Sequence, residues 1–305
     1  MNVPNLKTGV VGLGAMGEPM ARNLARAGLL ACVWNRTPAI ARQLADELGV
    51  TCAEDPADLA RRCDVILTCV STDSDLLDVM DALLPGLDPG KIVVDTSTVQ
   101  PTTAEDVEKL LNSAGCGFLD APVSGGVEGA QQGALAIMVG GKVSLLERVR
   151  PVLEAVSRRI AHMGPVGSGQ ATKAVNQIMC AGINHAVTEA LAFAEDLGLP
   201  LDKVIEVVSS GAAANWFLEK RGPTMVRCSF APGFKLALHY KDLAICKAIA
   251  ERRGVKLPVV EMTLIQYRRL LDSGYGDEDI SALYREKRKL FDKECEPGSE
   301  ERATG

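Results

Sequence analysis

Short apolar runs alternate with helical patterns through the first half of the chain. Residues 65–70 form an apolar run, which is typical of a strand covered on both faces. Residues 39–48 instead place Ile40, Leu44 and Leu48 at helical spacing, which predicts a helix. Repeated alternation of this kind predicts a parallel sheet with helices on both sides. The predicted strands are residues 8–11, 30–34, 65–70, 92–95, 118–119 and 135–139, and the predicted helices are residues 20–27, 39–48, 73–84 and 102–113.

The pattern changes near Gly164, beyond which no run predicts a strand. Residues 170–197 form one long helical stretch that contains a single glycine and no proline. We therefore expect an α/β domain over residues 1–165 and an all-α domain over residues 166–295, joined by this long helix. The polar residues 296–305 are expected to form a disordered tail. Further helices are predicted over residues 201–209, 215–221, 238–253 and 259–273.

Charge and composition exclude several classes of protein. The 305 residues include 33 Lys and Arg against 39 Asp and Glu, a net charge of −6, whereas a nucleic-acid-binding face needs clustered basic residues. No apolar stretch reaches the length that spans a membrane, and residues 1–7 lack the apolar run of a signal peptide. We therefore expect a cytoplasmic protein whose partners are neither nucleic acids nor membranes.

The cysteines and histidines show no metal-binding spacing. The nine cysteines are scattered, none lies in a C-x-x-C pair, and their number is odd, which favours reduced thiols in the cytosol. The three histidines, His162, His185 and His239, include no H-x-x-x-H pair. No metal site is therefore predicted.

Gly12, Gly14 and Gly17 form a G-x-G-x-x-G pattern between a predicted strand and a predicted helix. In this context the first glycine permits a tight turn, the second lets the backbone approach a pyrophosphate, and the third lets helix and strand pack closely. The helix N-terminus then offers N–H groups and the positive end of its dipole to the phosphates. The pattern predicts a dinucleotide-binding turn made of Gly12, Leu13, Gly14, Ala15, Met16 and Gly17.

The second predicted strand is followed by Asn35, Arg36 and Thr37, where a site for NAD would carry Asp or Glu. Asn35 lacks the carboxylate that would repel a 2′-phosphate, and Arg36 can form a charge-assisted fork to that phosphate. We therefore predict NADPH/NADP⁺ as the preferred cofactor, with NADH as the less favoured one.

Four blocks of sequence resemble, in order, those of the β-hydroxyacid dehydrogenase family, which includes 3-hydroxyisobutyrate dehydrogenase and the tartronate semialdehyde and glyoxylate/succinic semialdehyde reductases. The blocks are GLGAMGEPMARNLARAG at residues 12–28, FLDAPVSGG at 118–126, GSGQATKAVN at 167–176 and KDL at 241–243. Because they span nearly the whole chain, together they are far more specific than the glycine-rich turn alone. The resemblance implies a Rossmann domain, an all-α domain and a cleft between them.

The second block is expected to bind the substrate. Ser124, Gly125 and Gly126 follow Pro122, and two glycines expose consecutive backbone N–H groups beside the serine hydroxyl. Such a nest of donors suits a carboxylate, and the resemblance implies that these residues hold the carboxylate of the substrate. Asp120 is expected to fix the loop instead of contacting the substrate.

The third block contains the implied catalytic residue. The resemblance implies that Lys173 is the general acid and base at the substrate oxygen, a role for which burial would have to lower its pKa from about 10.4. Asn176 and Gln177 follow three and four residues later, on the same helix face. Family members often have an amide four residues after this lysine, commonly Asn, and this sequence departs from that pattern with Gln177. We expect Gln177 to contact the substrate and Asn176 to support it.

Further cofactor contacts are implied at the ends of predicted strands, which line the crevice of an open α/β sheet. Val70 and Ser71 are expected to flank the adenosine or diphosphate, and Thr98 the nicotinamide. From the second domain, Lys241 is expected to close over the cofactor while Asp242 orients it.

These expectations combine into one leading hypothesis, an NADP(H)-dependent oxidoreductase of small 3-hydroxy, 2-hydroxy or 4-hydroxy carboxylates and their semialdehydes or oxo acids. Arg36 favours the glyoxylate/succinic semialdehyde reductase branch. One alternative is an imine reductase, a class that typically replaces the lysine, and another is a non-catalytic NADPH-binding scaffold. The long helix is expected to pack against a second copy of the chain, in a homodimer or homotetramer.

Overall fold

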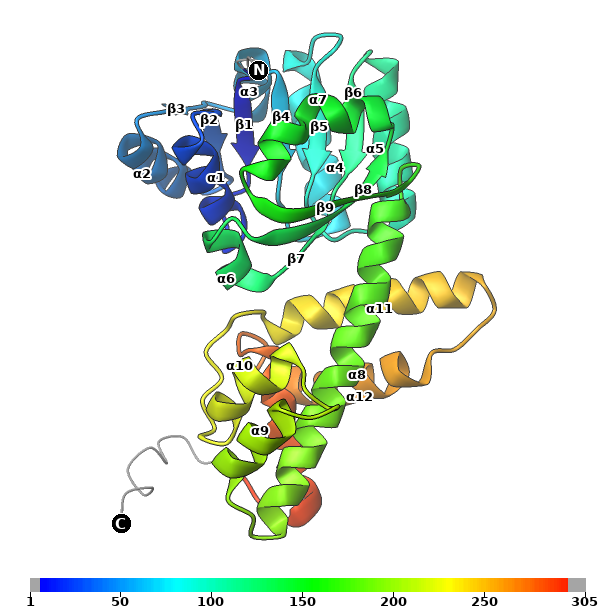
Figure 1. Cartoon of the computed structure of the whole chain (residues 1–305). Helices are drawn as coiled ribbons and strands as arrows, with labels where there is room; N and C mark the ends of the chain where they lie inside the picture. Colours follow the sequence, from blue (N-terminus) through cyan, green and yellow to red (C-terminus); the bar gives the residue numbers. More distant parts are fainter. Residues whose placement is uncertain (1–5, 296–305) are drawn as a thin grey trace. The chain divides into compact units, whose positions relative to one another are not determined.

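The computed structural model describes residues 6–295, and the chain divides into two compact units between Lys173 and Ala174 (Figure 1). The first unit combines a sheet with helices, whereas the described residues of the second unit form helices without a sheet. The predicted fold class is therefore confirmed. The predicted domain limits of 1–165 and 166–295 stay a prediction, and the predicted tail over 296–305 lies outside the described residues.

The described part of the first unit contains a nine-stranded sheet with the order β3-β2-β1-β4-β5-β6-β8-β7 and with β9 paired to β8. Within this order, the six strands from β3 to β6 run parallel to one another. β1 lies between β2 and β4, so the carboxyl end of β1 is a point where the strand order reverses, as at a ligand crevice. The strands are β1 (Thr8–Val11), β2 (Leu30–Trp34), β3 (Thr51–Cys52), β4 (Val65–Thr68), β5 (Ile92–Asp95), β6 (Gly117–Asp120), β7 (Val123–Ser124), β8 (Leu135–Gly141) and β9 (Ser157–Gly164).

The predicted parallel sheet extends from β3 to β6, but β8 runs antiparallel to both β6 and β7. The link from β7 to β8 holds only the six-residue helix α6 (Gly126–Gln131), which is shorter than the crossover of about a dozen residues that a parallel pair needs. β9 runs parallel to β8. It was not predicted because its sequence contains Arg158 and Arg159 and no apolar run. The structure gives the reason for that composition, since no residue of β9 is buried.

Successive residues of the central strands point to opposite faces, and each face is apolar. Val10 and Leu67 join one buried cluster, with side chains from α1, α2, α6 and α7, whereas Val11 and Ile66 join the other, with side chains from α3, α4 and α5. Because both faces of the sheet are covered by apolar side chains, the sequences of the central strands are nearly continuous apolar runs. The helices are α1 (Gly17–Arg26), α2 (Pro38–Leu48), α3 (Pro56–Arg62), α4 (Asp73–Leu83), α5 (Pro101–Ser113), α6 and α7 (Val143–Glu154), with a 3-10 turn over Leu84–Gly86.

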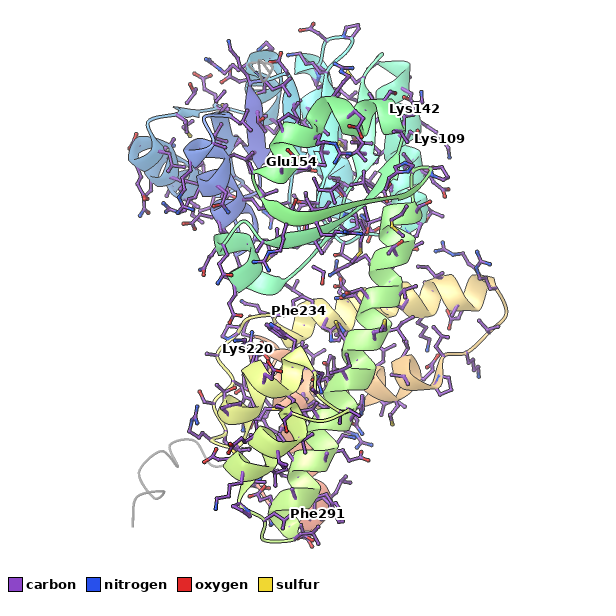
Figure 2. The ribbon with its side chains drawn as sticks, viewed as in Figure 1. Lys109, Lys142, Glu154, Lys220, Phe234 and Phe291 are labelled. Atoms are coloured by element: carbon purple, nitrogen blue, oxygen red, sulfur yellow. A yellow bond between two sulfur atoms is a disulfide. The ribbon has the colours of Figure 1, made fainter. Side chains whose placement is uncertain are left out.

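Helix α8 (Ser168–Asp196) begins in the first unit and continues through the second. The core of the second unit includes Tyr267 and Tyr284, both almost fully buried. Phe291 lies beside the far end of α8 in Figure 2, and its ring centroid is 6.2 Å from that of Phe193. No described helix is both long and apolar enough to cross a membrane. The remaining elements are α9 (Leu201–Ser209), α10 (Trp216–Met225), α11 (Leu236–Arg252), α12 (Pro258–Asp272), α13 (Leu283–Arg288) and the 3-10 turns Ile280–Ala282 and Lys289–Phe291.

Two of the nine cysteines, Cys228 and Cys295, form a disulfide, which corrects the prediction that all of them are reduced. They are 67 residues apart, so no local spacing in the sequence indicates the bond, and the fold brings their Cα atoms to 5.6 Å. Arg288 Nη1 lies 3.3 Å and 3.4 Å from the two sulfur atoms. The other seven cysteines are free thiols.

Candidate functional site

The glycine-rich turn joins β1 to α1 and has the geometry that a dinucleotide requires. Gly12 has a φ of +92°, and a Cβ added there would overlap the carbonyl oxygen of Cys69. A Cβ at Gly17 would overlap the carbonyl oxygen of Gly12. A Cβ at Gly14 would meet no described atom within 4 Å. The first and third glycines therefore permit close packing, and the second leaves open backbone that a pyrophosphate can approach.

Helix α1 begins directly after this turn, with the N–H group of Gly17 at its N-terminus. Of the next three residues, Glu18 and Met20 donate their N–H groups to the carbonyl oxygens of Gly14 and Met16, and Pro19 has no N–H group. The residue that precedes the helix is Met16, whose side chain makes no capping hydrogen bond. Leu13 and Ala15 complete the turn. An uncapped helix N-terminus beside a glycine-rich turn is a binding site for phosphate. The residues present therefore fit a dinucleotide.

Asn35 holds the turn through both ends of its amide. Its Oδ1 accepts a hydrogen bond from Leu13 N at 3.0 Å, and its Nδ2 donates to the carbonyl oxygen of Thr37 at 3.2 Å. Thr37 in turn precedes the first residue of α2. A neutral side chain thus occupies the position where a carboxylate would repel a 2′-phosphate.

Arg36 lies at the surface, with 84% of its side chain exposed. Its Nη1 donates to Asp75 Oδ1 at 2.8 Å, so its guanidinium is held by a carboxylate of α4. Sequence reasoning did not identify Asp75, because 39 residues separate the two and neither lies in a motif.

The ends of β4 and β5 are joined by a buried network of hydrogen bonds. Asp95 Oδ1 accepts from Thr68 Oγ1 and from Ser97 Oγ, each at 2.7 Å, and Ser97 Oγ accepts from Val70 N at 2.8 Å. This network fixes the backbone on which two predicted cofactor contacts depend. Those residues are Ser71, which is exposed, and Thr98, which is half-buried.

The predicted carboxylate nest lies between β7 and α6. Ser124 is the last residue of β7, and the next two residues have φ values of +139° at Gly125 and +63° at Gly126. Both values lie in the region that favours glycine, so these two glycines are required by the backbone itself. They lie next to the half-buried hydroxyl of Ser124.

Lys173 lies in the second turn of α8 and is 8% exposed. Its Nζ donates to the carbonyl oxygen of Val123 at 2.9 Å, and Val123 directly precedes Ser124. The ammonium group is therefore held beside the nest. A buried ammonium at this position can stabilise negative charge on a neighbouring oxygen and can give or take a proton there.

The start of α8 is fixed by two side chains. The carboxylate of Asp120 accepts from Gly167 N and from Gln170 N, each at 2.9 Å. Gln170 Nε2 donates to the carbonyl oxygen of Ser97 at 2.9 Å, while its Oε1 accepts from Val99 N at 3.1 Å. Burial raises the pKa of Asp120 to about 6, against the opposing effect of its two backbone donors. The expectation that Asp120 fixes a loop agrees with this geometry. Sequence reasoning missed Gln170, since its partners are more than 70 residues away.

The two predicted amides lie in a separate hydrogen-bonded chain within the second unit. Asn176 Nδ2 donates to Gln177 Oε1 at 2.7 Å, and Gln177 Nε2 donates to Asp242 Oδ2 at 2.7 Å. Asp242 Oδ1 lies 3.0 Å from Lys241 Nζ. Gln177 is 2% exposed, whereas Asn176 is half-buried. Direct contact between Gln177 and a substrate stays a prediction.

No group of three or more metal-binding side chains occurs among residues 6–295. The histidines have structural partners: His162 contacts the carbonyl oxygen of Gly141, and His185 contacts Thr263 Oγ1. His239 contacts Tyr267.

Comparison with known proteins agrees with the geometry. Residues 7–164 match the NAD binding domain of 6-phosphogluconate dehydrogenase, and residues 167–286 match the NAD-binding domain of NADP-dependent 3-hydroxyisobutyrate dehydrogenase. An uncharacterized oxidoreductase of Shewanella frigidimarina is 41% identical over 84% of this chain and 89% of its own length. The 2-hydroxy-3-oxopropionate reductase of Escherichia coli is 36% identical over 91% of this chain and 96% of its own length.

A solved structure is similar over nearly the whole chain. It is a 3-hydroxyisobutyrate dehydrogenase of Mycobacterium tuberculosis described with L-serine, with a TM-score of 0.84 and 32% identity. The match covers 93% of this chain and 99% of that one. The chain therefore belongs to the β-hydroxyacid dehydrogenase family, and it is an NAD(P)-dependent oxidoreductase that acts on CH–OH groups.

Proposed function

We propose that this enzyme interconverts a small 3-hydroxy carboxylate and its semialdehyde, or reduces a short oxo acid such as glyoxylate, and that it prefers NADPH to NADH. One observation carries the proposal: the buried Nζ of Lys173 lies 2.9 Å from the carbonyl oxygen of Val123, next to Ser124 and its two glycines. A proton donor is thus held beside a group suited to a carboxylate.

The residues of the nest bind and orient the substrate. A carboxylate would accept hydrogen bonds from the backbone N–H groups of Gly125 and Gly126 and from the Ser124 hydroxyl. Holding the carboxylate there would place the oxygen on the reacting carbon next to the neighbouring ammonium group. The short distance between the nest and the ammonium group of Lys173 selects substrates in which the carboxylate and the reacting carbon are close together.

Lys173 exchanges a proton with the substrate oxygen. As that oxygen gains negative charge during reduction, the ammonium group stabilises it and donates a proton from Nζ. In the oxidative direction the neutral amine accepts the hydroxyl proton. Asp120 and Gln170 hold the start of α8, and with it the backbone that carries Lys173.

The glycine-rich turn, Val70, Ser71, Thr98 and Lys241 are proposed to hold the dinucleotide. The nicotinamide, when bound, supplies or accepts the hydride. Arg36 would hold the 2′-phosphate, and this supports the preference for NADPH, since no carboxylate stands at position 35.

The first experiment is a panel of turnover measurements with purified protein, in which NADPH and NADH are tested separately. The oxo substrates are glyoxylate, succinic semialdehyde, tartronate semialdehyde and methylmalonate semialdehyde, L-serine is tested in the oxidative direction, and a cyclic imine is included. Turnover of one carboxylate with NADPH is expected. Turnover of the imine alone would favour an imine reductase, and tight cofactor binding without any turnover would favour a scaffold.

Replacing Lys173 tests the assigned chemistry. Lys173→Ala should lower kcat at least about a hundredfold, the usual contribution of a general acid, while cofactor affinity changes little. Lys173→Arg keeps the charge but cannot exchange a proton near neutral pH, so it should also be slow. Lys142→Ala removes an exposed lysine at the start of α7 and serves as the matched control (Figure 2). Near-normal turnover in Lys173→Ala would refute the assignment.

Self-association also stays a proposal. The side chains of Val175, Met179 and Ile183 recur at helical spacing along α8 within the second unit, and they are 57%, 63% and 37% exposed. An exposed apolar stripe of this kind supports packing against a second copy of the chain. Light scattering coupled to gel filtration gives the mass. A cytoplasmic location stays a prediction.

A further inference from the structure

The ion pair between Arg36 and Asp75 joins the two segments that flank the glycine-rich turn. β1, which leads into the turn, pairs with β2 on one side and with β4 on the other. Arg36 follows the end of β2, and Asp75 lies in the first turn of α4, the helix that follows β4. With 2.8 Å between Nη1 and Oδ1, the pair connects the two strands next to β1 beyond their carboxyl ends. That is the edge of the sheet at which the cofactor is proposed to bind.

The carboxylate of this pair is held more firmly than the guanidinium. Thr72 Oγ1 donates to Asp75 Oδ2 at 2.8 Å, and it also accepts from the backbone N–H of Asp75 at 3.1 Å. This reciprocal cap fixes the carboxylate at the start of α4. The hydrogen bond from Thr72, and then that from Arg36, hold the pKa of Asp75 below its usual value. Asp75 is 22% exposed and Arg36 is 84% exposed, so the arginine is the partner that can move.

A fixed negative charge beside Arg36 acts differently on the two nicotinamide cofactors. NADPH presents a 2′-phosphate, which has to share the guanidinium with Asp75 and is repelled by its carboxylate. NADH presents a ribose hydroxyl at the same position, which is neutral and suffers no such repulsion. The two residues of one ion pair therefore act in opposite directions on cofactor choice.

We propose that Asp75 is a specificity-determining residue, which weakens the preference for NADPH by competing with the 2′-phosphate for Arg36. The inference rests on the proposed role of Arg36 as the residue that binds this phosphate. It also assigns a function to an acidic residue at the start of α4, whereas the usual acidic determinant of cofactor choice follows β2.

The test measures the dissociation constants of NADPH and NADH for the full chain by calorimetry. Asp75→Asn removes the charge but keeps an oxygen that can accept from Thr72. It should raise the preference for NADPH about tenfold, which corresponds to about 1.4 kcal/mol and to one charge-assisted hydrogen bond. Asp78→Asn makes the same change of charge at an exposed position of the same helix and should alter the preference less than about twofold.

Two further variants separate this inference from the proposed preference for NADPH. Arg36→Ala should lower the preference for NADPH, and in the double variant with Asp75→Asn the gain from the second change should be much smaller. If Arg36→Ala leaves the preference unchanged, both proposals are wrong. If Arg36→Ala lowers it but Asp75→Asn leaves it unchanged or lowers it, the role of Asp75 alone is refuted. A gain in Asp75→Asn that equals the gain in Asp78→Asn refutes it as well, since only overall charge would then matter.

Discussion

Replacing Asp120 by Asn should change how the stability of the first unit depends on pH. Asp120 is fully buried at the end of β6 and accepts hydrogen bonds from two backbone N–H groups at the start of α8. Burial raises its pKa from 3.8 to about 6. Asparagine has nearly the same shape but does not titrate, so the pH dependence of the difference between variant and wild type isolates this one carboxyl group. Its Nδ2 replaces one of the two acceptor oxygens, and the hydrogen bond lost there lowers stability at every pH.

The sign and the magnitude follow from the raised pKa. Between about pH 4 and pH 6 the folded protein keeps the Asp120 proton while the unfolded chain loses it, so folding takes up a proton and stability falls as pH rises. The stability that Asp120 contributes by keeping its proton is fully present below pH 3.8, the pKa of the unfolded chain, and is lost as the pH rises through about 6. A change from 3.8 to about 6 corresponds to roughly 3 kcal/mol. For a unit of this size that is a shift in Tm of roughly 6 to 12 °C.

The assay is thermal unfolding of wild type and Asp120→Asn at a series of pH values from about 4 to 7.5. The variant should be much less stable than wild type at the acidic end, and the gap should close by the predicted amount toward neutral pH. Asp81→Asn, at an exposed position of α4, is the control. A gap that does not change with pH would show that Asp120 does not titrate near 6. A gap that widens toward neutral pH would show that its two N–H donors outweigh the effect of burial.

Two other predictions concern the glycine-rich turn and the disulfide. Gly14→Ala adds a Cβ that meets no described atom within 4 Å, so this variant should fold normally but bind the cofactor more weakly. Gly17→Ala adds a Cβ that would overlap the Gly12 carbonyl oxygen, so this variant should also have a lower Tm. Equal losses of Tm in the two variants would contradict this contrast. Cys228→Ser should lower the stability of the second unit by up to about 4 kcal/mol, which is the loop-closure entropy for two cysteines 67 positions apart. A reductant should lower the stability of the wild type by the same amount and should not affect the variant. A wild-type melting curve that reductant leaves unchanged would show that the bond to Cys295 does not stabilise the fold.

The sequence predicts those elements whose stabilising contacts leave a periodic pattern. β1 and β5 have the predicted limits and are buried at every residue, and strands buried on both faces are mostly apolar. Two-residue strands such as β3 and β7 are too short to show a pattern. α7 was not predicted, since it contains Pro151, a residue that usually ends a helix, close to its C-terminus. The direction of β8 depends on pairing between distant segments, and no local pattern records it.

The candidate site divides in the same way. The glycine-rich turn is recognisable because its conformational requirements fall within six consecutive residues. Asp75 lies in no motif, and Gln170 lies within the block at residues 167–176 without an indicated role, because the importance of each arises from partners 39 to 73 residues away. Residues that position a reacting group leave little trace in the sequence, whereas backbone positions that require glycine leave a clear one.

The edge strand β9 limits how this protein can aggregate. β9 pairs only with β8 among the described strands, so its other side presents unpaired backbone groups. An edge of eight residues could recruit a strand from another molecule, but Arg158 and Arg159 place two positive charges on it. A second molecule that paired there in the same register would bring like charges together. Polymerisation by pairing between the β9 edges of two molecules is therefore disfavoured. Replacing both arginines by threonine should make the protein more prone to form fibres.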